Sequence, residues 1–78
     1  MNQYIATFFT HFGAVRFCRM LKERGVDGKV MPVPRKVSSS CGSCVRFTAE
    51  TEAAFHTEDV EGIYLAQDDG YIQLYSSL

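Results

Sequence analysis

Residues 4–33 read YIATFFTHFGAVRFCRMLKERGVDGKVMPV and predict one complete β-α-β unit. The aromatic and β-branched run from Tyr4 to Phe9 is typical of a central strand that is buried on both faces. A helix is predicted from Gly13 to Arg24, because apolar residues recur there at the spacing i, i+3, i+4 and i+7. These apolar helix positions are Ala14, Phe17, Cys18 and Leu21.

Two further elements are predicted on the C-terminal side of this helix. Gly25 is a typical helix terminator. Residues 29–33 favour a second strand, which Pro32 restricts to a sheet edge because proline donates no ladder hydrogen bond. A polar loop of small residues follows over positions 35–43. Residues 44–49 then alternate between apolar and polar side chains, which indicates a third strand.

The remaining residues complete the predicted order of elements. Thr51 to Asp59 resembles a short helix, and Val60 to Ala66 and Tyr71 to Tyr75 favour two strands joined at Asp68-Asp69-Gly70, a strong hairpin signal. The order is therefore β-α-β-β-α-β with an appended C-terminal strand. This order predicts an α+β, ferredoxin-like split β-α-β sandwich, with helices on one face of an antiparallel sheet. We expect a single domain over residues 1–78.

Composition and charge exclude several classes of protein. The chain is 46% hydrophobic and 22% charged, with a formal net charge of −1, which is ordinary for a globular domain and does not favour a nucleic-acid groove. No apolar run approaches the roughly 20 residues that span a bilayer. Residues 1–12 lack the basic region and cleavage site of a signal peptide. We therefore expect a soluble cytoplasmic protein with no nucleic-acid or membrane partner.

The three cysteines are the most conspicuous chemical feature. An odd number, with Cys41 and Cys44 only three residues apart, does not fit the even, dispersed pattern of a disulfide framework. The pattern instead indicates a close thiol pair in a reducing compartment. It favours redox, sulfur-transfer or metal chemistry over a structural cross-link.

The predicted topology places the Cys41 loop at the start of the first helix, beside Thr10, His11 and Gly13. Free backbone N–H groups and the positive end of the helix dipole point toward this place and would stabilise a thiolate. The serines at 38–40 add hydroxyl donors. The alternative is that Cys41 is a small, half-buried turn residue. We favour function, because an exposed loop cysteine is prone to oxidation unless it is used.

The other candidate residues each have two interpretations. Cys44 is either a resolving thiol in a C-x-x-C pair or a strand residue on the open sheet face, and His11 is either a general base and thiolate partner or a helix-flanking residue. Cys18 is expected in the core and His56 on the solvated surface. The nearby carboxylates are expected to form a solvated cluster: Glu58, Asp59 and Glu61. A zinc site from these cysteines and histidines is conceivable, but the second half of a strong zinc motif is absent. We therefore expect no metal and no cofactor.

The chain resembles the selenium/sulfur carrier-like family of small domains. The similarity rests on P-x-P-R at residues 32–35, S-S-C-G at 39–42 and G-I-Y at 62–64, together with the opening strand and the helix that ends at Gly25. The resemblance implies that Cys41 holds sulfur or selenium as a persulfide or selenosulfide. Cys44 departs from the family, which usually has an apolar residue there, and residues 51–60 are short for a second helix.

These observations favour a carrier or accessory protein over a stand-alone enzyme. Cys41 would accept sulfur from a donor such as a cysteine desulfurase and pass it to an acceptor protein. Cys44 could release the sulfur by attacking Cys41 and forming a disulfide. The alternatives are a non-catalytic binding or regulatory module and a small metal-binding domain that uses the same loop.

The open face of the predicted sheet suggests a second interaction. Alternation puts Val45, Phe47, Ile72 and Leu74 on the helix face. It puts Arg46, Tyr71 and Tyr75 on the open face, with either Tyr4 and Phe8 or Ile5 and Phe9 from the first strand. Aromatic residues on an exposed face often mark a protein interface. We therefore expect a homodimer, or the docking of a partner protein, through the open face. The alternative is a solvated sheet with scattered tyrosines.

Overall fold

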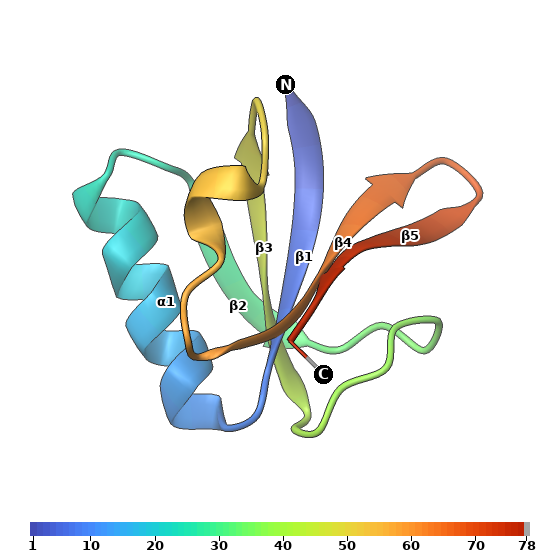
Figure 1. Ribbon diagram of the computed structural model, residues 1–78, viewed down its shortest axis with the longest axis horizontal. Coiled ribbons are helices and arrows are strands. Elements are labelled where there is room, and N and C mark those ends of the chain that lie inside the picture. Colours follow the sequence, from blue (N-terminus) through green and yellow to red (C-terminus); the bar gives the residue numbers. More distant parts are fainter. Residues whose placement is uncertain (78) are drawn as a thin grey trace.

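The computed structural model describes residues 1–77, which form an α+β fold with one α-helix and a five-stranded antiparallel sheet (Figure 1). The sheet has the strand order β2-β3-β1-β4-β5. The elements are β1 (Asn2–Phe8), α1 (His11–Glu23), β2 (Gly28–Pro32), β3 (Ser43–Ala49), η1 (Ala53–Phe55), β4 (Val60–Gln67) and β5 (Gly70–Ser76). The predicted α+β class is thus confirmed. No helix among these residues is long and apolar enough to cross a membrane.

Helix α1 begins two residues earlier than its apolar pattern predicts. Thr10 is extended, with φ −138° and ψ 157°, and its hydroxyl accepts a hydrogen bond from Gly13 N at 3.0 Å. This side-chain cap satisfies one of the N–H groups that the first helical turn leaves unpaired. The helix ends just before Gly25, whose φ of 74° suits glycine and reverses the chain toward β2.

One face of the sheet packs against α1 through a row of aromatic rings. The ring centroids of Phe8 and Phe17 are 5.1 Å apart, and those of Phe17 and Phe47 are 5.7 Å apart. The centroid of Phe47 is in turn 5.2 Å from that of Phe55. Tilted pairs of this kind add about 0.5–1.5 kcal/mol each beyond the area they bury. The row joins β1, α1, β3 and η1 into one core, and it sets Tyr4 and Phe8 on the helix side.

The predicted second helix over 51–59 is wrong. The segment contains only the three-residue 3₁₀ turn η1, in which Phe55 alone is buried. Glu52, at the start of this turn, makes no side-chain cap, and Thr51 Oγ1 accepts a hydrogen bond from Ala53 N at 3.3 Å instead. A local bond of this type competes with helix formation, and one buried residue does not make an apolar stripe.

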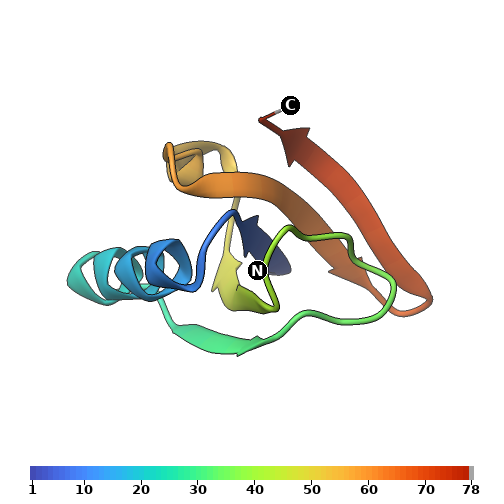
Figure 2. The same ribbon diagram turned by 90° about the horizontal axis from the view of Figure 1, so that it is seen from below.

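The face opposite α1 is partly covered, in contrast to the predicted open face. Figure 2 shows the β2–β3 loop on the far side of the sheet from α1. Val37 of this loop is 5% exposed, and Ile5 of β1 is 2% exposed, although neither belongs to the helix-side core. Tyr64 OH also donates a hydrogen bond to Ser38 O at 3.5 Å. Homodimer formation through this face stays a prediction, with less free surface to support it.

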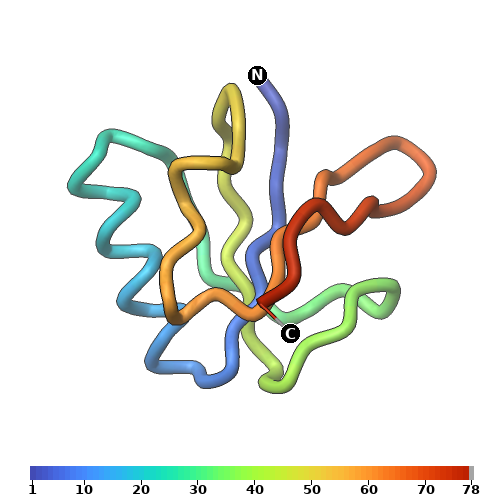
Figure 3. The backbone as a smooth tube through the Cα atoms, viewed as in Figure 1, coloured from blue at the N-terminus to red at the C-terminus, as the bar shows by residue number. Residues whose placement is uncertain are grey.

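The predicted alternation is wrong at Tyr75 in β5, whereas Ile72 pairs with Leu65 on the helix side as predicted. Tyr75 packs against the helix-side core and stacks on His56 at 4.1 Å, whereas Ile72 and Leu74 are 46% and 44% exposed. The pairing of β4 with β5 shifts register between Ile63 and Tyr64. A shift of one residue exchanges the two faces of a strand. The β4–β5 hairpin also projects away from α1 (Figure 3), and its apolar side chains Ile72 and Leu74 are exposed.

Candidate thiol site

The Cys41 loop meets the start of α1, as its predicted position requires. His11 Nδ1 lies 2.8 Å from Ser43 Oγ, so the first residue of α1 is joined to the first residue of β3. Figure 3 shows the β1–α1 turn and the end of this loop at the same end of the sheet. The two segments lie at the same end because β1 pairs antiparallel with β3, which puts Thr7 near the end of β1 opposite Cys44 near the start of β3.

Two serines hold the loop in place. Ser39 Oγ donates to Phe8 O at 3.3 Å and accepts from Cys41 N at 3.3 Å. Ser40 N donates to Glu61 Oε1 at 2.9 Å, and Ser40 Oγ also binds the Glu61 carboxylate. The hydroxyls of Ser39 and Ser40, which were predicted as donors at Cys41, therefore bind the backbone and Glu61 instead.

Glu61 is a site residue that sequence reasoning missed, since it was expected among solvated carboxylates. Glu61 is the second residue of β4 and lies next to the end of β1, because Phe8 pairs with Val60. From there its carboxylate reaches across to the loop. Only knowledge of the β1–β4 pairing could have revealed this contact, because Ser40 and Glu61 are 21 residues apart.

Cys41 is half-buried near the C-terminal end of this anchored loop. Its Sγ lies 3.4 Å from Ser43 O, and its side chain packs against the edge of the helix-side core. Gly42 beside it is exposed, and an added side chain at this glycine would meet no atom within 4 Å. The surface at Gly42, the residue after Cys41, is therefore open to another molecule.

Cys44 has a different environment. It is fully buried on the face of β3 that points away from α1, and its Sγ lies 3.6 Å from Pro32 O. Burial raises the pKa of the Cys44 thiol to about 11, and the neighbouring Cys41 adds to the shift. Cys44 is therefore protonated near neutral pH, and a protonated thiol is a poor nucleophile.

The remaining predicted candidates lie outside this site. Cys18 is half-buried on α1, where its Sγ donates to Gly28 O at 3.5 Å. His56 is exposed, but it pairs with Glu52 and stacks on Tyr75. Within residues 1–77, no three His, Cys, Asp or Glu side chains are grouped so as to hold a metal ion. The metal-binding alternative therefore has no ligand set in the described part of the chain.

A bidentate ion pair joins α1 to the segment just before β4. The Arg16 guanidinium donates two hydrogen bonds to the Asp59 carboxylate, at 2.8 and 2.6 Å. Hydrogen bonding from Arg16 holds the pKa of Asp59 below its ordinary value. The bidentate geometry ties the second turn of α1 to the residue before β4. Asp59, like Glu61, was expected to be a solvated surface residue.

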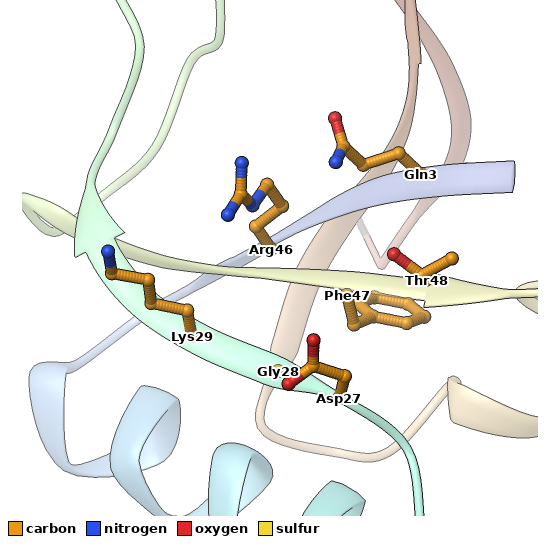
Figure 4. Close-up of a pocket in the computed structure, with 7 residues that line it drawn as sticks. All are labelled: Gln3, Asp27, Gly28, Lys29, Arg46, Phe47 and Thr48. Atoms are coloured by element: carbon orange, nitrogen blue, oxygen red, sulfur yellow. The ribbon is translucent and has the colours of Figure 1, made fainter.

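A separate hollow lies at the opposite end of the sheet and contains no thiol. It has a volume of about 200 Å³ and includes side chains of β1, β2 and β3 (Figure 4). Figure 4 shows the polar ends of Gln3, Lys29 and Arg46 on the same side of these strands. The hollow is lined by residues of β3 that are distant from the Cys41 end of the strand, and it is therefore distinct from the candidate thiol site.

Fold and site together define a small α+β domain that presents a loop cysteine beside the start of its helix. The chain belongs to the family described as "Putative Se/S carrier protein-like", whose model matches residues 3–64. The match includes Cys41 and Glu61 and ends within β4. Neither the curated proteins nor the solved structures contain a significant match to the chain. The predicted resemblance to this family is confirmed.

Proposed function

We propose that the protein carries sulfur or selenium on Cys41. The observation that carries this proposal is the half-buried Cys41 on a loop anchored by Ser39, Ser40 and Ser43, next to open space at Gly42. An anchored loop holds a reactive atom at a fixed place, which lowers the entropic cost of bringing it to a partner's sulfur. Membership in the carrier-like family supports the same conclusion.

Loading requires one nucleophilic displacement. The Cys41 thiolate attacks the outer sulfur of a donor persulfide, such as that of a cysteine desulfurase. A new S–S bond forms on Cys41, the donor S–S bond breaks, and its electron pair leaves with the donor sulfur as a thiolate. The step conserves electrons and needs no cofactor. A selenium atom in the outer position would follow the same path to a selenosulfide.

Unloading has two candidate routes. In the first, an acceptor thiolate attacks the outer sulfur and releases Cys41 as a thiolate. In the second, Cys44 attacks Cys41 Sγ, which forms a Cys41–Cys44 disulfide and releases hydrosulfide. The burial and raised pKa of Cys44 favour the first route, because the second needs the loop to open and Cys44 to lose its proton.

His11 is proposed as a positioning residue. Its Nδ1 holds Ser43 Oγ, and the carbonyl of the same Ser43 contacts Cys41 Sγ. The imidazole therefore acts on the sulfur through Ser43, which fixes the end of the loop.

The fold is proposed to be a ferredoxin-like plan with a reduced second crossover. Strand β3 lies between β1 and β2, as a split β-α-β unit requires, and β4 lies on the other side of β1. In this interpretation η1 stands where a second helix would be, and β5 is an addition at the sheet edge.

The experiment is intact-mass spectrometry after incubation with a persulfide donor. Wild-type protein should gain the mass of one sulfur atom, and Cys41→Ser should gain none. Cys18→Ser serves as the matched control and should load like the wild type. Equal loading of Cys41→Ser and wild type would refute the assignment of Cys41.

A further inference from the structure

The small net charge of the chain conceals a strong separation of charge along the sequence. All eight Lys and Arg residues lie within residues 1–49, together with only two of the nine acidic residues. Residues 50–78 contain the other seven acids and no Lys or Arg. Four of the cations are on α1 or its C-cap: Arg16, Arg19, Lys22 and Arg24. Helix α1 therefore presents a basic surface on a nearly neutral protein.

A groove runs along this basic helix where α1 lies beside the edge strand β2. Val15, Cys18 and Val30 form its apolar floor. Arg19 and Lys22 form its rim, and the groove has a volume of about 290 Å³. Neither rim cation forms an ion pair with any residue in 1–77. The groove thus combines an apolar floor with two uncompensated positive charges.

A second stripe of α1 leads from the groove toward the thiol site. Phe12, Val15, Arg19 and Lys22 follow the spacing i, i+3, i+7 and i+10, which puts them on one side of the helix. Phe12 is 68% exposed and Val15 is 39% exposed, which is unusual for large apolar residues on a helix that has a complete core face. Phe12 adjoins His11, which contacts the end of the Cys41 loop.

We infer that the α1–β2 groove docks an acidic, apolar segment of a partner protein. The unpaired Arg19 and Lys22 attract carboxylates, and the floor offers apolar contact to Leu, Ile or Phe side chains between them. A purely polar segment would leave the apolar floor in contact with water. A basic segment would be repelled by the two cations. The docking does not depend on chemistry at Cys41, but it places the partner beside that residue.

The test is selection of a displayed library of random peptides on the wild-type protein. Enriched peptides should combine Asp or Glu with large apolar residues, and their binding should weaken as salt is raised. Their affinity should fall about tenfold on the Arg19→Glu, Lys22→Glu variant, since both rim charges are inverted. A Lys36→Glu, Arg46→Glu variant has the same change of net charge on the other side of the sheet, and should bind like the wild type.

Three outcomes would overturn the inference. The first is that the selection does not enrich acidic, apolar peptides. The second is that the Arg19→Glu, Lys22→Glu double variant binds the peptides as tightly as the wild type. The third is that the wild type self-associates and this double variant does not. The last result, measured by light scattering, would make a second copy of the chain the occupant. Thermal unfolding of both double variants checks that they fold, which is expected because all four side chains are exposed. Sulfur loading of Cys41 in the same variants separates failure of docking from failure of the proposed carrier function.

Discussion

His11 Nδ1 and Ser43 Oγ lie 2.8 Å apart and join the start of α1 to the start of β3, directly next to Cys41. The pair closes the loop at its C-terminal end, while Ser39 and Ser40 hold its middle. Every one of these anchors links residues that are far apart in the sequence. The position of the Cys41 sulfur therefore depends on the folded sheet and not on the loop sequence alone.

The His11–Ser43 pair should act as a unit in sulfur loading. His11→Ala and Ser43→Ala should each slow loading of Cys41 several-fold, and the double variant should be no slower than either, because both remove the same contact. His11→Asn should restore most of the rate, since its amide can hydrogen-bond Ser43. Time-resolved intact mass measures these rates. If the double variant lost loading rate by the product of the two single-variant factors, the two residues would act separately.

The Ser40–Glu61 contact should keep Cys44 covered. Glu61→Ala should lower the free energy of unfolding by about 1–2 kcal/mol, because it removes two hydrogen bonds from Ser40 to a carboxylate. It should also speed alkylation of Cys44, since the loop opens more often. Urea denaturation and peptide mapping after alkylation measure the two effects. Glu58→Ala, at an exposed neighbouring position, is the control, and an equal effect there would contradict the anchoring role.

The three thiols should differ in their rates of alkylation at neutral pH. Cys41 should react first, Cys18 more slowly and Cys44 last, because Cys44 is fully buried and its pKa is raised to about 11. Peptide mapping of the folded protein over time gives the order. Labelling of Cys18 at the rate of Cys41 would contradict the proposed thiol site.

The raised pKa of Cys44 also predicts how stability depends on pH. Between its ordinary pKa of 9.0 and the folded value of about 11, the unfolded chain loses the thiol proton while the folded chain keeps it. The folded state then binds more protons than the unfolded state, so the free energy of unfolding falls as pH rises through this range. The fall due to Cys44 should be about 2–3 kcal/mol.

The matched variant for this prediction is Cys44→Val, which keeps an apolar side chain at the position. Other groups titrate in the same range, so the quantity of interest is the difference between wild type and variant in urea denaturation at pH 8 to 11. A difference that stays constant across this range would contradict the raised pKa of Cys44.

Sequence patterns predicted the elements whose signals are local. The spacing of Ala14, Phe17 and Leu21 correctly gave the buried side of α1, and alternation gave the orientation of Val45 and Phe47 in β3. The placement of the Cys41 loop near α1 also followed, because it depends only on the order of strands around one helix.

Most of the errors share one physical cause, which is pairing between distant residues. The register shift between Ile63 and Tyr64 moved Tyr75 to the helix side, and no residue in β5 signals this shift. The partners of Arg16 and Ser40 were likewise unpredictable, since Asp59 and Glu61 stand in a charged run that is usually solvated. The second helix failed for a different reason: residues 51–59 bury only Phe55 on the core side.

The most direct test of the central claim is intact-mass spectrometry of wild type, Cys41→Ser and Cys44→Val after incubation with one persulfide donor. Wild type and Cys44→Val should each gain one sulfur atom, which a thiol reductant should remove, and Cys41→Ser should gain none. Sulfur gained by Cys41→Ser to the same extent as wild type would contradict the account.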